Sequence, residues 1–413
     1  MKIRVGKTFA EADYTTGVHQ GDNMSPVLFL FVIQAFLDTL KLSSNPINFS
    51  HFPENKNGNL DTIKGRLVSQ NTTAKGTPFS FNSSFYVDDS FFVFETIQEL
   101  RQAIIELNQH FSRFGLIMHL GSETSKSKSE AMFFPNSLKQ ARINYDNDIL
   151  PNYLQLPNNK KVHFVKNFKY LGSVITPLLN EDAEIDIRIK KAKSIMGASK
   201  HFFDNKDIDK KIKAEIYIAG PLNALLWGCE AWNLTKNNLK KIMSFHHSAI
   251  RRILNIRWDQ VREKHIKNHE VRGLLCNIPN IYAYINKRTA TYIGKISRSN
   301  PKTYPKKFLT AWIHGKRKNG HPQLTCNNNY ARVIEKIMPN DKPLINKQAP
   351  LKEWLPIAVN ENNWMECIDT YFNSCRNIIN LDELNPKNVD EPENEPENEP
   401  EETDPGGVHR TPP

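Results

Sequence analysis

The stretch FYVDDSFFVF, residues 85–94, places two adjacent carboxylates between two apolar runs. Strand-forming residues on both sides of Asp88 and Asp89 predict a β-hairpin with the acidic pair at its turn. Because aspartate is common in turns, a purely structural turn is one interpretation. Tight hairpin turns favour glycine, however, and this one has none, so we expect backbone strain. Divalent cations would offset the repulsion between the two carboxylates, which makes metal binding the second interpretation.

The composition favours a polyanionic partner. The chain has 413 residues and a formal net charge of +11. The acidic stretch at residues 389–404 contains no Lys or Arg, so the preceding chain is more basic than the total suggests. Nucleic acid is the most common partner of such a chain. A solvated lysine-rich surface is an equally good interpretation of charge alone.

The sequence indicates a soluble intracellular protein with no membrane partner. Its five cysteines are odd in number and lack a C-x-x-C pair, which favours free thiols in a reducing compartment. The N-terminus lacks the apolar core of a signal peptide. The most apolar run, residues 27–37, is roughly half the length of a membrane span.

A helix and a loop are predicted ahead of the acidic pair. Ser25 is a good N-cap and Pro26 suits the first helical position, so a helix should run to about Leu40. This helix is apolar on most faces, which predicts burial. Residues 41–84 are rich in Asn, Ser, Thr and Gly and are expected to form a long loop with little regular structure.

Beyond the acidic pair, the pattern predicts a helix, short strands and then a helical region. Apolar residues at helical spacing follow Ile97, with Gly115 as a stop. Short strands are expected within residues 130–135 and 168–177. From Asp182 onward the period is helical. A later helix should end or kink at Pro221, and another should begin from a Thr235 cap.

Two pairs of residues, one of histidines and one of tryptophans, are interpreted as structural. Adjacent residues on a helix point to different faces, so His246 and His247 are interpreted as packed or surface residues rather than metal ligands. Trp227 and Trp232 are expected in the core.

Four motifs in order identify a family resemblance. They are GVHQGDNMSPVLF, FYVDDSFFVF, FGLIMHL followed by SKSEAMFF, and FKYLGSVIT. Their order and spacing resemble the reverse transcriptases of non-LTR (LINE-type) retrotransposons. The later stretches RIKKAKSIMGA, LLWGCEAWNLT, FHHSAIRRIL and GHPQLT are similar to the region that follows the palm in such elements. The resemblance covers most of the chain from Gly17 to about Thr325.

The resemblance implies roles for the hairpin and for one lysine. Asp88 and Asp89 match the family's Y-x-D-D hairpin and are expected to bind Mg²⁺, with Mn²⁺ as a substitute. Asp88 is the expected direct ligand, whereas Asp89 assists less directly. Lys128 matches a lysine expected to supply a proton or charge to the leaving pyrophosphate.

Two further motifs match surfaces that contact the substrates. The template and incoming nucleotide would be lined by Gln20, Gly21, Ser25 and Pro26. The primer end would be gripped by a hairpin containing Tyr170, Leu171 and Gly172. The implied partners are an RNA template, a DNA primer or duplex, and deoxynucleoside triphosphates. Basic helices of a thumb would bind the duplex through Arg188, Lys190, Lys191, Lys193, Lys240, Lys241, Arg251 and Arg252.

The sequence departs from the family at its N-terminus. Members hold a third aspartate on a strand before GVHQGD, but only residues 1–16 precede Gly17 here. Glu11 and Asp13 do not match that strand, and the fingers that would precede it are missing. We therefore expect a fragment of an RNA-directed DNA polymerase that is inactive as this chain alone. The alternative is a non-catalytic nucleic-acid-binding remnant of a mobile element.

The expected fold class is α+β. A partial reverse transcriptase palm, an antiparallel sheet with helices, should span residues 1–178. It should be followed by a helical thumb-like region at 179–260 and a helical C-terminal region at 261–380. The acidic tail at 381–413 is expected to be disordered, because its composition cannot form a core.

Overall fold

The structure is a computed structural model with an α+β fold, as predicted. It describes residues 2–6, 8–11, 17, 21–51, 77–122, 125–135, 137–147, 149–150, 152–313, 326–338 and 351–377. The chain divides into two compact units. Unit 1 comprises residues 1–54, 60–184 and 301–315, and unit 2 comprises residues 55–59, 185–300 and 316–413. The predicted tail at 381–413 lies outside the described residues.

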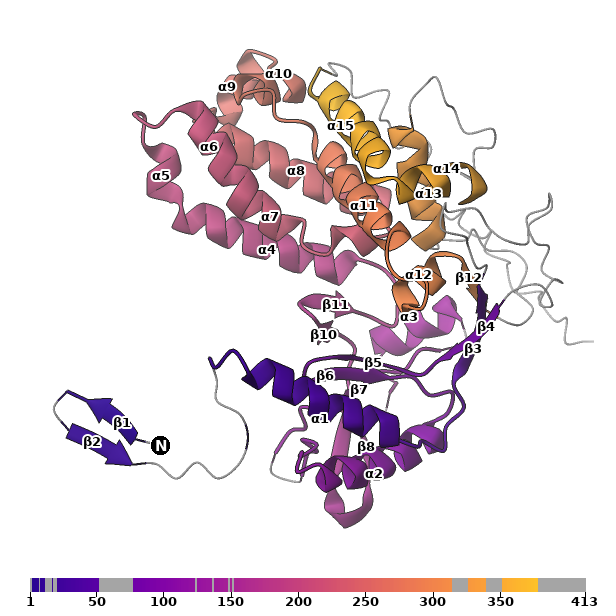
Figure 1. Ribbon diagram of the computed structural model, residues 1–413. Helices are drawn as coiled ribbons and strands as arrows, with labels where there is room; N and C mark the ends of the chain where they lie inside the picture. The colour runs from indigo at the N-terminus through magenta and orange to yellow at the C-terminus, as the bar shows by residue number, and fades with distance from the viewer. Residues whose placement is uncertain are drawn as a thin grey trace, which may run out of the picture. The chain divides into compact units, whose positions relative to one another are not determined.

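Unit 1 combines short strands with four complete α-helices in its described part (Figure 1). Its helices are α1 (Ser25–Thr39), α2 (Ile97–Arg113), α3 (Leu138–Asn147) and α12 (Tyr304–Leu309). Its strands are β1 (Lys2–Val5), β2 (Thr8–Glu11), β3 (Ile47–His51), β4 (Thr77–Phe81), β5 (Ser83–Tyr86), β6 (Asp89–Phe92), β7 (Glu130–Ala131), β8 (Tyr153–Gln155), β9 (Lys161–Phe164), β10 (Phe168–Tyr170), β11 (Ser173–Ile175) and β12 (Ala311–Ile313).

The strands form small separate sheets. β1–β2, β5–β6 and β10–β11 are antiparallel pairs. A three-stranded antiparallel sheet has the order β12-β3-β4, and a second sheet has the order β7-β9-β8 with β7 parallel to β9. The short strands predicted within residues 130–135 and 168–177 are therefore confirmed.

The loop predicted for residues 41–84 is wrong in its described part, because β3, β4 and the start of β5 lie there. The stretch 52–76 lies outside the described residues. Phe49 and Phe79 stack across β3 and β4 with ring centroids 5.4 Å apart, and Phe308 of α12 packs against both. This partner comes from more than 200 positions later in the sequence, so local composition could not indicate it.

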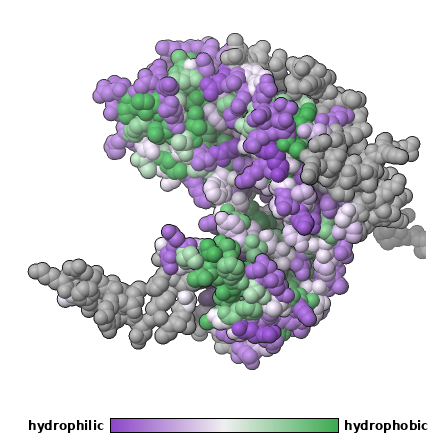
Figure 2. All heavy atoms as spheres, in the orientation of Figure 1, coloured by the Kyte–Doolittle hydropathy of each residue, from purple (hydrophilic) through white to green (hydrophobic). Residues whose placement is uncertain are grey.

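The helix expected from Pro26 is confirmed as α1, but its predicted burial is wrong. Only Ser25, Ile33 and Phe36 are buried, whereas Phe31 is 70% exposed. Hydrophobic side chains accordingly gather on the surface over α1 (Figure 2). Ser25 is also not the N-cap. It lies inside the helix, and the carboxylate of Asp22 accepts a hydrogen bond from the N–H of Met24 at 3.1 Å.

The helix predicted after the acidic pair is confirmed as α2. The hydroxyl of Thr96 accepts a hydrogen bond from the N–H of Glu99, which caps its first turn. It ends at Arg113, and Gly115 follows with a φ of 69°. Ile104 on its buried face packs against Ala131, Leu154 and Val162 of the β7-β9-β8 sheet.

Unit 2 is helical in its described part (Figure 1). It contains most of α4 (Asp182–Ala198), together with α5 (Lys200–Asp204), α6 (Lys210–Tyr217), α7 (Asn223–Leu225), α8 (Lys236–Ile253), α9 (Trp258–Glu263), α10 (Asn268–Leu274), α11 (Ile281–Ser297), α13 (Cys326–Ile337), α14 (Leu351–Val359) and α15 (Glu361–Asn377).

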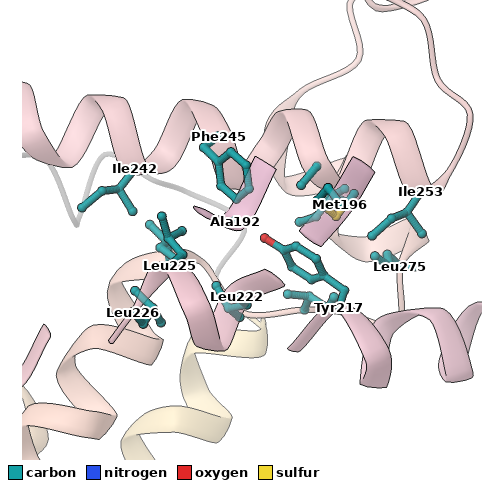
Figure 3. Close-up of a cluster of buried hydrophobic side chains, with 14 of the residues drawn as sticks. Ala192, Met196, Tyr217, Leu222, Leu225, Leu226, Ile242, Phe245, Ile253 and Leu275 are labelled. Carbon is teal, nitrogen blue, oxygen red and sulfur yellow. The ribbon is translucent and has the colours of Figure 1, made fainter. Parts of the chain in front are cut away.

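One hydrophobic cluster holds the first half of unit 2 together. Residues from α4, α6, α8, α10 and α11 belong to it, and Figure 3 shows Tyr217, Leu222 and Ile253 among them. Because the cluster contains residues before and after position 260, the predicted thumb-like and C-terminal regions share this core. Pro221 lies in a π-helical turn, Ile218–Leu222, directly after α6, which agrees with the predicted interruption. Thr235 caps α8 as expected.

The interpretations of the paired histidines and tryptophans are confirmed in part. His246 and His247 are buried and packed, and Trp232 is buried as expected. Trp227 is exposed, so its predicted burial is wrong. In the part of the chain that the structure describes, no helix is long and apolar enough to cross a bilayer.

Candidate functional site: the acidic hairpin

The acidic pair lies at the tip of the β5–β6 hairpin, one position away from the predicted turn centre. Tyr86 pairs with Asp89 across the strands, so Val87 and Asp88 form the two-residue loop and Asp89 begins β6. Val87 has a φ of 59°, which is rare for a β-branched residue and costs about 1–3 kcal/mol. The predicted backbone strain is confirmed, and it falls directly before Asp88. Both aspartates are exposed.

The two faces of the hairpin have different partners. Paired residues share a face, so Asp89 and Phe91 lie on the same face as Tyr86 and Ser84. Phe85 lies on the opposite face, and its ring meets that of Phe36 at 6.0 Å in an edge-on arrangement. The face of the hairpin that carries Phe85 therefore packs against α1, and the face that carries Asp89 is directed away from that helix.

Phe36 of α1 is the anchor of this arrangement. Its side chain is fully buried, and its ring stacks on Phe111 of α2 at 4.4 Å. The imidazole of His110 lies 4.7 Å from the same ring, and its Nε2 is 3.0 Å from the carbonyl oxygen of Phe36. The sequence interpretation missed His110. Its position three residues after Leu107, on the apolar face of α2, is the signal that it contributes to packing.

The expected primer-grip hairpin lies beside the acidic hairpin. Tyr170 and Ser173 pair across β10 and β11, leaving Leu171 and Gly172 as the loop with φ values of 47° and 87°. Two positive φ values are typical of the type I′ turn of tight hairpins. The ring of Tyr170 packs edge-on against that of Phe91 at 5.3 Å.

Electrostatics also connects the two hairpins. Burial raises the pKa of Tyr170, a hydrogen bond with Ser84 lowers it, and the negative charge of Asp89 raises it again. The Tyr170 hydroxyl is therefore neutral at pH 7 and lies within electrostatic range of Asp89. In the middle of β11, the N–H of Val174 donates a hydrogen bond to the carboxylate of Glu184 at 2.8 Å.

The residues expected to line the template are described only in part. Gln20 lies outside the described residues. Gly21 has a φ of 92°, a conformation that favours glycine. Ser25 is buried and Pro26 is exposed at the start of α1. These two residues connect to the acidic hairpin through α1, whose Phe36 touches Phe85. Their expected contact with a template stays a prediction.

Lys128 has an exposed side chain on the segment before β7. Its backbone N–H donates to Nδ1 of His119 at 3.1 Å. The preceding Ser127 is buried and its hydroxyl lies 2.9 Å from Nδ1 of His163 in β9. Among the described residues, no hydrogen bond or ion pair joins the Lys128 side chain to Asp88 or Asp89. Its expected role at the leaving group stays a prediction.

The donor chemistry of the hairpin tip fits Mg²⁺. Carboxylate oxygens are its preferred protein ligands, and one or two carboxylates suffice when water and substrate phosphates complete the shell. Asp88 and Asp89 are both exposed at the tip and form no ion pair within the described residues. No cluster of three or more His, Cys, Asp or Glu residues suited to a metal occurs in that part of the chain. Glu11 belongs to β2, and Asp13 lies outside the described residues.

The set of basic residues expected to bind a duplex needs a correction. Lys190 and Lys193 of α4 are exposed, as the expectation requires. Arg188 and Arg251 are buried, and Lys241 forms an ion pair with Asp186 at 2.8 Å. The reason is helical packing: Arg188 lies one turn after the buried Ile185 on α4, and Arg251 lies one turn after the buried His247 on α8.

The comparisons with known proteins give one relative. Over 134 residues, the chain is 28% identical to an uncharacterised transposon-derived protein of Caenorhabditis elegans. The match covers 32% of this chain and 47% of the relative, so the chain spans about half of that protein's length. No family model matches the chain, and no solved structure matches it.

Proposed function

We propose that the chain derives from the reverse transcriptase of a non-LTR retrotransposon, with the β5–β6 tip as the metal-binding part of an RNA-directed DNA polymerase site. The observation that carries the proposal is the contact between the two motif hairpins, through Phe91 and Tyr170. Two stretches about 80 residues apart, each matched to a polymerase motif by sequence, meet in space. The C. elegans relative, which is named as transposon-derived, supports a mobile-element origin.

The chemistry would be nucleotidyl transfer from deoxynucleoside triphosphates to a primer end. When bound, divalent ions supply charge stabilisation for the attacking and leaving oxygens. The chain's own contribution is positioning. Asp88 and Asp89 would hold the ions at the tip of a hairpin whose opposite face packs against Phe36 through Phe85. Tyr170, which stays neutral beside Asp89, would offer a hydroxyl and a ring edge to the primer without adding a negative charge.

Primer extension tests this proposal. The assay uses purified chain, an RNA template with a DNA primer, four deoxynucleotides, and Mg²⁺ or Mn²⁺. Any extension should be abolished by Asp88→Asn, because this change removes the carboxylate and keeps the size. The matched control is Asp146→Asn, an exposed aspartate on α3 in the same unit. Extension that survives Asp88→Asn unchanged would contradict the assignment of the hairpin.

A second candidate is a non-catalytic nucleic-acid-binding protein of the same origin. The net charge of +11 and the exposed Lys190 and Lys193 of α4 favour it. Such a protein would bind duplexes with a steep salt dependence and extend no primer. Extension that depends on Asp88 would exclude this candidate, whereas duplex binding without nucleotide-dependent metal binding at Asp88 would favour it over the polymerase.

A further inference from the structure

Glu184, in the first turn of α4, is a buried acidic residue in the same unit as the two hairpins. It is 1% exposed. Glutamate is almost never fully buried unless it is paired, because removing its charge from water is costly. The N–H of Val174, in the middle of β11, donates a hydrogen bond to the Glu184 carboxylate at 2.8 Å. The buried carboxylate therefore binds directly to the backbone of the β10–β11 hairpin.

The pairing of β10 with β11 explains why the N–H of Val174 is available to Glu184. Tyr170 and Ser173 flank the two-residue loop, so they are a pair that exchanges backbone hydrogen bonds. The next pair, Lys169 and Val174, is then of the non-hydrogen-bonded kind, and its N–H groups point away from the partner strand. Glu184 thus accepts a hydrogen bond from the outer edge of β11 and leaves the ladder of the hairpin intact.

The β10–β11 hairpin depends on contacts outside itself, because each of its strands has only three residues. An isolated two-stranded hairpin is at best marginally stable in water. On β10, the ring of Tyr170 packs against Phe91 and its hydroxyl forms a hydrogen bond with Ser84. On β11, the hydrogen bond from Val174 to Glu184 holds the other strand. The hairpin is therefore fixed on one strand to β5–β6 and on the other strand to α4.

We propose that Glu184 is a positioning residue for the primer end. By fixing β11 to the first turn of α4, it keeps the hairpin in the orientation that places Tyr170 beside Asp89. Glu184 acts through Tyr170 and not on the reacting atoms. This inference rests on the proposed function, because only that function gives the hairpin a primer to bind.

The hydrogen bond can be removed from either side. Glu184→Ala deletes the acceptor, but Arg188 is buried one turn later on α4, so this variant also changes the charge balance there. Val174→Pro deletes the donor and keeps the carboxylate, and proline is tolerated because this N–H lies outside the ladder. Glu184→Gln keeps an acceptor oxygen. The matched control is Glu99→Ala, in the first turn of α2, where the carboxylate also accepts a backbone N–H, from Glu95 at 3.1 Å.

Hydrogen–deuterium exchange of the full chain tests whether Glu184 holds the hairpin. Peptides covering residues 168–175 should exchange at least about tenfold faster in Glu184→Ala and in Val174→Pro, because a hydrogen bond to a buried carboxylate is lost. The same peptides should exchange as in the wild type in Glu184→Gln and in Glu99→Ala. Unchanged exchange in both Glu184→Ala and Val174→Pro would overturn the inference.

Primer-end binding tests whether the position of the hairpin matters for the proposed site. Fluorescence anisotropy compares two labelled duplexes with strands of the same lengths, one with a recessed 3′ end and one with a recessed 5′ end. The wild type should bind the recessed 3′ end about tenfold more tightly, the worth of one or two hydrogen bonds. Tyr170→Ala, Glu184→Ala and Val174→Pro should lose this preference and keep their affinity for the recessed 5′ end. Glu184→Gln and Glu99→Ala should keep the preference.

The primer-end assay separates failure of this inference from failure of the proposed function. Loss of the preference in Tyr170→Ala, with the full preference in Glu184→Ala and Val174→Pro, would overturn the role of Glu184 and leave the primer assignment of the hairpin in place. Loss in Glu184→Ala but not in Val174→Pro would overturn it too, because the hydrogen bond would then be irrelevant. A wild type without the preference, or a Tyr170→Ala variant that keeps it, would contradict the proposed function and the positioning role with it.

Discussion

Replacing Phe36 with alanine should weaken the packing of α1 against α2 and against the β5–β6 hairpin. The side chain is fully buried and meets the rings of Phe85, His110, Phe111 and Phe114 at 4.4–6.0 Å. Phenylalanine-to-alanine changes in cores cost about 3–5 kcal/mol, and with four ring contacts we expect about 4 kcal/mol for Phe36. A loss of about 4 kcal/mol makes the open state of this region nearly a thousandfold more populated.

Hydrogen–deuterium exchange with peptide resolution measures this change within unit 1. Amides of α1 and α2 should exchange up to about a thousandfold faster in Phe36→Ala, whereas peptides of α8 and α11 in unit 2 should not change. Phe31→Ala is the matched control, because it is the same substitution on the same helix at a side chain that is 70% exposed. It should cost at most about 0.5 kcal/mol. Equal effects of the two substitutions would refute the packing of α1 described above.

Three further predictions concern a turn, a buried histidine and a basic surface. Gly172→Ala should destabilise unit 1 by about 1–2 kcal/mol in denaturant unfolding, because φ is 87° there, whereas Gly197→Ala, in a helix with open space at the added Cβ, should be neutral or stabilising. Burial lowers the pKa of His247 from 6.5 to about 4 in the folded state, so the unfolded state binds more protons between these two pH values. The free energy of unfolding should therefore be highest above pH 6.5 and fall as the pH drops toward 4, and this decline should be shallower in His247→Gln. Exchanging Lys190 and Lys193 for alanine should reduce the slope of log Kd for a duplex against log salt by about 1–2, and an unchanged slope would exclude this face of α4.

Sequence patterns predicted correctly those helices and strands that depend on residues close to them in the chain. Thr235 and the apolar spacing of α2 sufficed to place two helices, and the apolar runs around Asp88 and Asp89 sufficed to predict the hairpin. The turn centre was shifted by one residue, because the cross-strand pairing of Tyr86 with Asp89 sets the register and composition does not.

Features that depend on distant partners could not be predicted from the sequence. β3 and β4 are stabilised by Phe308 of α12, far along the chain. The apolar composition of α1 predicted burial, yet α2 and the β5–β6 hairpin cover only the face with Phe36. Arg251 was likewise expected on the surface, because a basic residue in a helical pattern does not show which side of the helix faces the core.

The contact between the two hairpins was predictable only as a consequence of the family resemblance. Nothing in the spacing of Phe91 and Tyr170 indicates that their rings meet. Backbone strain in this turn was foreseeable, since a two-residue turn without glycine requires a strained residue, but its location at Val87 depends on the strand register. Strain of this kind gathers at functional sites, which is why the metal interpretation of this turn deserves a direct measurement.

Electron paramagnetic resonance of Mn²⁺ tests the central claim, that Asp88 and Asp89 bind divalent metal together with a nucleotide. Free Mn²⁺ is titrated with the full chain, with and without a deoxynucleoside triphosphate, for the wild type, Asp88→Asn and Asp146→Asn. Binding by the wild type and the Asp146 variant should be weak alone and stronger with nucleotide beyond what the nucleotide binds by itself, because substrate phosphates complete the metal shell. Asp88→Asn should lose this increase. An equal increase in all three proteins would contradict the account.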